Sequence, residues 1–159
     1  MWTGVPMRAV LQRVSHAQIV VVGAPIARIS NGILALIGIS REDTPEDLQW
    51  MARKIVELRI FDDREGKLNL CLQEVDGELL LVSQFTLYGD CRKGRRPSFS
   101  NAAPPEKAQA LYDQFVSMVR QLIPGTQTGQ FQATMEVTLT NSGPVTLILD
   151  SRQRSAPSY

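Results

Sequence analysis

The chain has 159 residues, of which 43% are apolar and 21% charged, and its net charge at pH 7 is +1. This length suits one domain with a core that needs no disulfide or metal, and the composition excludes a disordered chain, a collagen-like repeat and a disulfide-framework miniprotein. Seventeen basic residues nearly balance sixteen acidic ones. A nucleic-acid binder that is cationic over its whole surface is therefore excluded, although a local basic patch remains open.

The cellular compartment is indicated by what the chain lacks. No apolar run is long enough to span a bilayer, and Met1–Pro6 has no secretory-signal pattern. Cys71 and Cys91 fit no metal-ligand spacing, and His16 is the single histidine. We therefore expect a cytoplasmic protein with two free thiols, no metal, no cofactor and no membrane association.

The N-terminal half begins with short strands. Alternation over Met7–Val14 predicts an amphipathic strand, and Gln18–Val22 with Ile26–Ile29 predicts a hairpin around Gly23 and Pro25. The continuous apolar run Ile33–Ile39 is typical of a buried strand.

The first helix is expected at Pro45–Leu58, because Thr44 is a good N-cap, Pro45 suits the first turn and apolar residues follow at helical spacing. Strands are predicted at Lys67–Leu72 and Glu78–Thr86, and a second helix at Pro105–Ile123.

The last part of the chain is strand-like. The alternation from Phe131 to Leu139 predicts a strand that Asn141–Pro144 interrupts and Val145–Leu149 resumes. These elements predict a mixed α/β, β-rich single domain of two packed sheets with two helices, built from seven or eight strands. The domain is expected at 7–151, between an N-terminal extension (1–6) predicted to be disordered and a frayed tail (152–159).

The inventory of reactive side chains excludes several mechanisms. His16 is the one candidate for a catalytic imidazole, and its position suits a surface residue better than a base. No GxSxG, P-loop or GxGxxG motif is present. An enzyme with this sequence would have to use backbone dipoles, hydroxyl groups or a group that its substrate supplies.

Each of three segments could have a functional role or a purely structural one, and composition alone does not decide between the two interpretations. Ser83–Thr86 could present polar groups to a ligand or could simply be where a strand reaches solvent. Asn141–Thr146 could bring main chain close to a ligand or could be a hairpin turn. The basic loop Arg92–Arg96 could hold phosphates or be a solvated loop.

Together these segments resemble the D-aminoacyl-tRNA deacylase family. The resemblance covers Met7 to about Ser151, and it rests above all on SQFTL (Ser83–Leu87) and on GPVT (Gly143–Thr146) in this order. Further matching residues are Gln12–Val14, Arg59–Phe61, Gly66–Asn69, Gly94, Arg96–Phe99, Ala110–Tyr112, Thr128, Gly129, Phe131, Met135, Val137 and Asn141. Two departures are the residues before Met7 and Ser142, which stands where the family commonly has aspartate.

The resemblance implies a hydrolase that removes D-amino acids from tRNA, as chirality proofreading in translation. It implies a homodimer with each active site at the subunit interface, catalytic groups at Ser83, Gln84, Phe85 and Thr86, and a Gly143–Pro144 pair, in cis, inserted from the partner subunit. Phe131 and Met135 would wall the pocket, and Arg13 would orient the inserted loop. The tRNA-facing residues would be Arg92, Lys93, Arg95 and Arg96.

The resemblance also implies a chemistry. Backbone N–H groups near Phe85 would stabilise the oxyanion, and the terminal 2′-hydroxyl of the tRNA would assist, in preference to Thr86 as nucleophile, because Thr86 has no base near it in sequence. A main-chain wall would reject L residues by shape, so we expect broad activity on D residues and some on glycyl-tRNA. The rival interpretations are a non-catalytic nucleic-acid- or partner-binding module and a self-associating structural protein.

Overall fold

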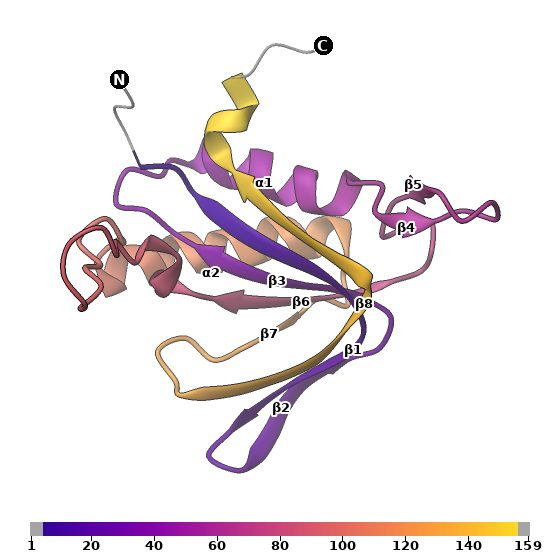
Figure 1. Cartoon of the computed structure of the whole chain (residues 1–159), viewed down its shortest axis with the longest axis horizontal. Helices are drawn as coiled ribbons and strands as arrows, with labels where there is room; N and C mark the ends of the chain where they lie inside the picture. The colour runs from indigo at the N-terminus through magenta and orange to yellow at the C-terminus, as the bar shows by residue number, and fades with distance from the viewer. Residues whose placement is uncertain (1–4, 156–159) are drawn as a thin grey trace.

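The described residues, 5–155 of the computed structural model, contain eight strands, two α-helices and two short 3-10 helices (Figure 1). None of these helices is long and apolar enough to cross a membrane. The mixed α/β class, the high strand content and both helices are as expected. In chain order the elements are β1 (Arg8–Val21), β2 (Ala24–Ile29), β3 (Gly32–Gly38), α1 (Pro45–Glu57), β4 (Phe61–Asp62), β5 (Leu68–Leu70), β6 (Glu78–Ser83), η1 (Phe85–Tyr88), α2 (Pro105–Leu122), β7 (Gln127–Thr128), β8 (Met135–Asp150) and η2 (Ser151–Ser155).

Strand β1 organises the main sheet because it pairs with three other strands. Its first half pairs antiparallel with β3, its second half pairs antiparallel with β2, and β8 follows its opposite edge along the whole length. β6 then pairs parallel with β3, and β7 parallel with β6. Irregular register between β1 and β8 near Val14 accompanies the bend that carries the second half of β1 away from the helices (Figure 1).

This topology corrects the expectation of two packed sheets. One six-stranded sheet curves far enough to be nearly closed, and β4 with β5 forms a separate two-stranded sheet. The difference arises because residues 8–21 form one bent strand that belongs to both parts of the curve, whereas sequence reasoning divided the segment into two strands.

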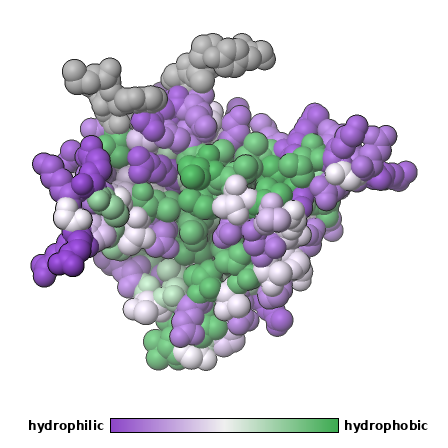
Figure 2. Space-filling model, viewed as in Figure 1, coloured by the Kyte–Doolittle hydropathy of each residue, from purple (hydrophilic) through white to green (hydrophobic). Residues whose placement is uncertain are grey.

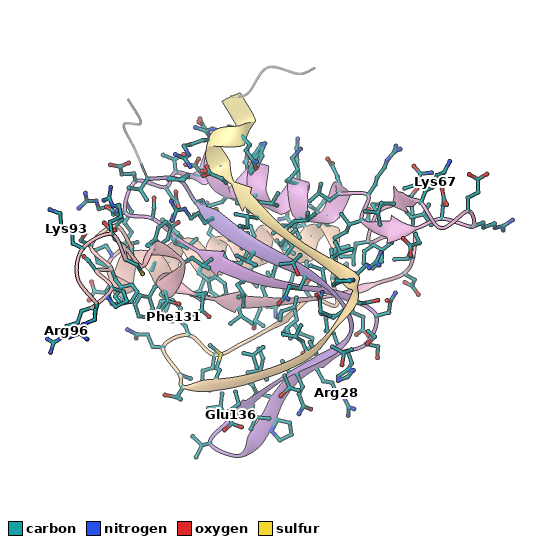
Figure 3. All side chains as sticks on the ribbon, viewed as in Figure 1. Arg28, Lys67, Lys93, Arg96, Phe131 and Glu136 are labelled. Carbon is teal, nitrogen blue, oxygen red and sulfur yellow. The ribbon has the colours of Figure 1, made fainter. Side chains whose placement is uncertain are left out.

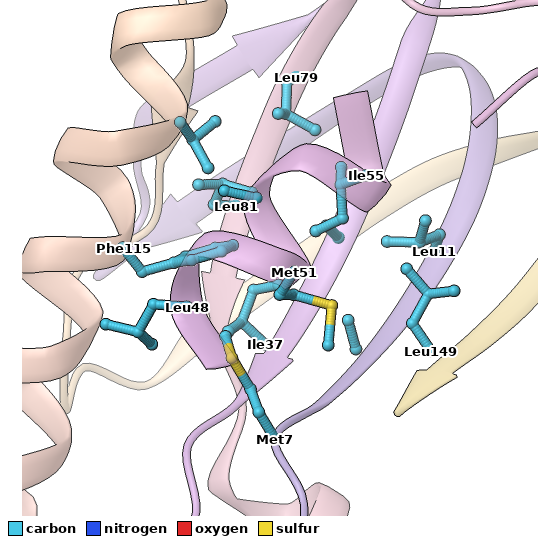
Figure 4. Packing of buried hydrophobic residues seen from close by; sticks show 14 of the residues in the cluster. Met7, Leu11, Ile37, Leu48, Met51, Ile55, Leu79, Leu81, Phe115 and Leu149 are labelled. Atoms are coloured by element: carbon cyan, nitrogen blue, oxygen red, sulfur yellow. The ribbon is translucent and has the colours of Figure 1, made fainter. Parts of the chain in front are cut away.

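The curved sheet has apolar contacts on both faces of β3 and β6. On one face Ile33, Ile37 and Leu81 belong to the apolar cluster that includes residues of α1 and α2. Figure 4 shows Ile37 and Leu81 beside these two helices. On the other face Leu34 and Leu80 pack against the apolar residues of β1 and β2. Two-sided burial explains why these strands read as continuous apolar runs rather than alternating ones.

Helix α1 begins where its capping residues predict. The Asp47 carboxylate accepts hydrogen bonds from the Thr44 N–H (2.9 Å) and the Thr44 hydroxyl (3.0 Å), and Pro45 occupies the first turn. The helix ends at Glu57, within one residue of the expectation, and α2 ends at Leu122, also within one.

Two expected strands are corrected at their ends. β6 ends at Ser83 rather than Thr86, because β3 ends at Gly38 and offers no further ladder partner; Gln84 donates a last hydrogen bond to the Ile37 carbonyl (2.7 Å), and η1 follows. β8 begins at Met135 rather than Phe131, since Gln132 has a positive φ (60°) and belongs to a turn.

The Asn141–Pro144 segment also differs from the expectation, because it lies within β8 and does not divide it. The Asn141 amide donates to the Arg13 carbonyl (3.0 Å) and to the Val145 carbonyl (3.1 Å), so a side chain bridges the irregular part of the ladder. Pro144 lies on the strand that ends the sheet on this side of β1, where an absent N–H removes no ladder bond among the described strands.

The two ends of the described chain contact the domain. Val5 donates its N–H to Glu42 (2.7 Å), and Arg154 in η2 lies 3.5 Å from Asp47 of α1. Of the extension and the tail proposed above, 1–4 and 156–159 lie outside the described residues.

Candidate active site

The end of β6 forms one side of the largest cavity we describe. Ser83 is the last residue of the strand, Gln84 leaves the sheet, and Phe85 starts η1. These residues line a cavity of about 730 Å³. Its lining consists of Ile39, 82–85, Phe99, Ser100, 102–105, Ala108, 131–133, Met135 and Val137. The structure thus brings together five of the sequence-predicted site residues from two separate parts of the chain, 83–85 and 131–135.

Aromatic rings from three parts of the chain, Phe85, Phe99 and Phe131, line this cavity. Phe85 and Phe99 pack edge to face with their ring centroids 5.2 Å apart, and Phe85 remains 57% exposed. Phe131 stacks on Tyr112 at 6.2 Å, and the Tyr112 hydroxyl donates to the Leu81 carbonyl (3.1 Å). Phe131 is therefore held by a buried ring that is itself fixed to β6. Such walls can bind a planar, apolar or heteroaromatic group.

The polar groups of the cavity are backbone, hydroxyl and amide groups. No charged side chain is among its lining residues. Within residues 5–155, the N–H groups of Phe85 and Thr86 make no hydrogen bond, as expected for the first turn of a 3-10 helix. The Gln84 amide contacts the Thr86 hydroxyl. Unpaired N–H groups beside an apolar wall are suited to stabilising an oxyanion.

Thr86 and His16 both lie outside the lining of the cavity. Thr86 is not among the residues that line the cavity, and its hydroxyl is engaged by Gln84. His16 is an exposed residue of β1 whose ring nitrogen lies 3.4 Å from the Thr140 hydroxyl on β8. The imidazole is therefore on another part of the sheet, as its sequence position suggested.

Gly143 and Pro144 lie on β8 and do not line this chain's own cavity. Among the described residues every peptide bond is trans, so the cis bond that the resemblance implied is corrected; Gly143 turns the backbone with a φ of +101° instead. Both residues are exposed. They are thus presented outward from the bent part of the sheet.

The side chain of Arg13 holds the Gly143 segment in place through hydrogen bonds and close packing. This arginine is only 7% exposed, and its guanidinium donates to the Ser142 carbonyl (3.1 Å), to the Ile60 carbonyl (2.9 Å) and to Asp62 (3.3 Å). A Cβ atom on Gly143 would lie 1.9 Å from the Arg13 Nη2. The buried guanidinium therefore fills the space next to Gly143 and holds the segment through the Ser142 carbonyl.

The basic loop lies beside the cavity and forms a hairpin. Asp90 and Ser98 close it with two backbone hydrogen bonds (2.7 and 3.0 Å), and the next residue is Phe99 of the cavity wall. Arg92 is paired with Asp90 (2.7 Å), and this hydrogen-bonded pairing lowers the Asp90 pKa to about 2. Lys93 and Arg96 extend outward from the tip of the loop (Figure 3).

Sequence reasoning missed part of the wall. Phe99, Ala102–Pro105 and Ala108 line the cavity, although none was proposed as a site residue. Their signal was weak: Phe99 ends the RRPSF run of the basic loop, and the Pro104–Pro105 pair precedes α2. The spacing of apolar residues along the sequence predicts local structure only, so it could not show that these residues lie near β6.

Comparison with known proteins identifies the family of the chain. A family model described as D-Tyr-tRNA(Tyr) deacylase matches residues 10–150. The chain belongs to the D-aminoacyl-tRNA deacylase family. The family comprises hydrolases of the ester bond of aminoacyl-tRNA.

Individual relatives match over nearly their full length. The chain is 57% identical over 146 residues to the D-aminoacyl-tRNA deacylase of Desulfatibacillum aliphaticivorans, covering 92% of this chain and 100% of the relative. It is 54% identical over 147 residues to that of Thermosipho africanus (92% and 99%). A solved structure titled c-Myc DNA Unwinding Element Binding Protein is similar with a TM-score of 0.85 and 40% identity, covering 95% of this chain and 99% of that one. A probable eukaryotic D-amino acid tRNA deacylase shares the fold, with a TM-score of 0.80 and 22% identity over 91% of this chain and 99% of that one.

Proposed function

We propose that this deacylase-family chain hydrolyses the ester of D-aminoacyl-tRNA in the cavity at the end of β6. The observation that carries the assignment to this cavity is the meeting of Ser83–Phe85 with Phe99, Phe131 and Met135 around a space of about 730 Å³. Aromatic walls suit the terminal adenosine of the tRNA, and the polar strand end suits the ester. Proofreading during translation would make the enzyme cytoplasmic.

The reaction needs an oxyanion site and a proton acceptor. Water attacks the ester carbonyl, and the unpaired N–H group of Phe85, which lines the cavity, stabilises the negative oxygen, one well-placed donor contributing roughly 2.7–4 kcal/mol. The ester C–O bond then breaks, which releases the amino acid and leaves the tRNA with its terminal hydroxyl. The lining offers no titratable side chain, so the neighbouring 2′-hydroxyl of the tRNA relays the proton. Thr86 as nucleophile is disfavoured for the same lack of a base.

Discrimination between mirror images comes from Gly143–Pro144 of a second copy of the chain. This pair is exposed on β8, is absent from the lining of its own cavity and is braced by Arg13. The face that carries β8 has an extensive apolar surface (Figure 2), and Ile148 of β8 is 72% exposed. A homodimer that buries this face would bring each pair to the partner's cavity.

A wall of main-chain atoms selects by exclusion. It would clash with an L side chain and leave a D side chain directed to solvent, and it moves less than a side-chain wall would. Glycine has no side chain to clash, so glycyl-tRNA should be cleaved as well. Lys93, Arg95 and Arg96 would contact tRNA phosphates next to the cavity, with Arg92 held by Asp90.

The deciding assay is deacylation of one tRNA charged with a D residue, its L counterpart and glycine. We expect release of the D residue and of glycine and little release of the L residue. Efficient cleavage of the L ester would contradict exclusion by the Gly143–Pro144 wall. Binding of the tRNA without turnover would instead support the binding-module interpretation.

A further inference from the structure

A buried acid and serine lie behind the cavity wall, in the loop between β3 and α1. Ser40 is fully buried and Asp43 is 6% exposed. The Ser40 N–H donates to one carboxyl oxygen of Asp43 (2.8 Å), and the Ser40 hydroxyl lies 2.9 Å from the other. No catalytic step described above uses either residue.

When Asp43 is ionised, the hydroxyl of Ser40 has too few protons for the hydrogen-bond acceptors around it. The Ser40 hydroxyl has one proton and two acceptors within reach, the Asp43 carboxylate and the Val5 carbonyl (2.7 Å). If Asp43 holds a proton, that proton can be donated to the Ser40 oxygen, and the Ser40 hydroxyl can donate to Val5. The neutral acid therefore satisfies every group of the cluster, whereas the anion leaves one acceptor without a donor.

The same loop holds the segment that forms one side of the cavity. Ser40 forms an antiparallel bridge with Ala102, the Ala103 N–H donates to the Ile39 carbonyl (3.0 Å), and the Ala102 N–H donates to the Phe99 carbonyl (3.1 Å). Ile39, Ala102 and Ala103 line the cavity directly, and Phe99 packs on Phe85. The position of this wall depends on the shape of the loop that Asp43 and Ser40 hold.

We propose that Asp43 and Ser40 form a clasp that positions the 99–105 wall of the cavity, so that substrate binding responds to the protonation state of Asp43. Asp43 is a positioning residue, because it acts through Ser40 and touches no reacting atom. The inference rests on the assignment of the ester to this cavity.

The environment of Asp43 places this response near neutral pH. Burial raises its pKa to about 7, although the hydrogen bonds from Ser40 act in the opposite direction. Three other groups face the Asp43 carboxyl. The charge of Asp47 in α1 raises the Asp43 pKa, and the charge of Lys107 in α2 lowers it. Tyr88 of η1 is a buried phenol, and the charge of Asp43 raises the Tyr88 pKa. Lys107 also contacts the Arg41 carbonyl, so α2 is tied to the same loop.

The test compares wild type with Asp43→Asn and Asp43→Ala, using D-aminoacyl-tRNA and the full-length chain from pH 5.5 to 8.5. The amide of Asn reproduces the donor and acceptor of the protonated acid. We therefore expect Asp43→Asn to keep the low-pH KM at every pH, so the wild-type to variant ratio of kcat/KM should change with an inflection near pH 7. Taking the ratio cancels the titration of the substrate's own amino group. Asp43→Ala should raise KM by about tenfold to a hundredfold with a smaller change in kcat.

Controls separate positioning from general damage and from failure of the assigned function. Asp76→Asn, an exposed acid in a distant turn, should give a flat ratio across pH. If Asp43→Ala fails to fold, Ser40→Ala with its own KM measurement replaces it. A flat ratio for Asp43→Asn, or a lower melting temperature with an unchanged KM for the alanine variant, would overturn the inference. Wild type that does not cleave the D ester would overturn the proposed function instead.

Discussion

Replacing Gly143 with alanine should destabilise the protein through two separable effects. The backbone at Gly143 has a φ of +101°, which costs a residue with a Cβ about 1–2 kcal/mol. The new Cβ would also lie 1.9 Å from the Arg13 Nη2, so the guanidinium must move. A hydrogen bond from a charged donor contributes about 1.5–3 kcal/mol, and Arg13 donates to the Ser142 carbonyl beside Gly143 and to the Ile60 carbonyl.

If the displaced guanidinium loses one of these bonds, the total cost is about 3 kcal/mol, which corresponds to a melting temperature lowered by roughly 6–12 °C. Gly66→Ala is the matched control, since Gly66 also has a positive φ (77°) but open space where its Cβ would be. That variant should show only the backbone cost of about 1–2 kcal/mol. Urea unfolding at one fixed protein concentration measures both.

A double-mutant cycle identifies the cause. In an Arg13→Ala background the Cβ introduced by Gly143→Ala meets no guanidinium, so this second substitution should cost only the backbone term. Equal costs of Gly143→Ala in the two backgrounds would refute the role given to Arg13. We also expect Gly143→Ala to reduce discrimination against L esters, because the wall it belongs to must shift.

Three further predictions concern the cavity, the basic loop and the buried acid. Phe131→Ala should raise KM for D-aminoacyl-tRNA by about tenfold, because one aromatic wall of the cavity is lost. Steady-state kinetics measures this change, and Leu68→Ala, which replaces an exposed apolar side chain, is the control. Arg95→Ala and Arg96→Ala should each weaken tRNA binding and lower the slope of log binding constant against log salt concentration by about one counterion. Arg92→Ala should change this slope less, because Arg92 is already paired with Asp90. Measuring tRNA binding at several salt concentrations tests both expectations. The folded-state pKa of Asp43 is raised from its ordinary value of 3.8 to about 7, so its contribution to stability is full below about pH 4 and is lost as the pH rises through 7. Asp43→Asn should flatten the unfolding free energy over this window, and an unchanged pH profile would contradict the raised pKa.

Local signals were sufficient for the elements whose ends are marked by specific residues. Thr44 and Pro45 located the start of α1, and the alternation after Met135 located the first half of β8. The errors lie where a partner strand decides the outcome. β6 stops at Ser83 because β3 has ended, and residues 8–21 remain one strand because β8 follows them throughout.

The site was predictable in part for a similar reason. Ser83–Phe85, Phe131 and Met135 were identified by resemblance, and the structure brings them around one cavity. The wall at 99–105 depends on contacts with Ile39 and Ser40, which lie far earlier in the chain, and no local pattern records such a contact. The Gly143 geometry likewise depends on Arg13, on a different strand.

The pairing of β1 with β8 joins the beginning of the domain to its end, from Arg8 opposite Asp150 to Val21 opposite Met135. During synthesis at roughly 5–20 residues per second, the end of β1 at Val21 is made about 6–26 s before β8 is complete at Asp150. Throughout that interval one edge of β1 has no partner from its own chain. A nascent chain of this fold therefore depends on rapid helix formation, or on a chaperone, to keep that early edge from pairing with another molecule.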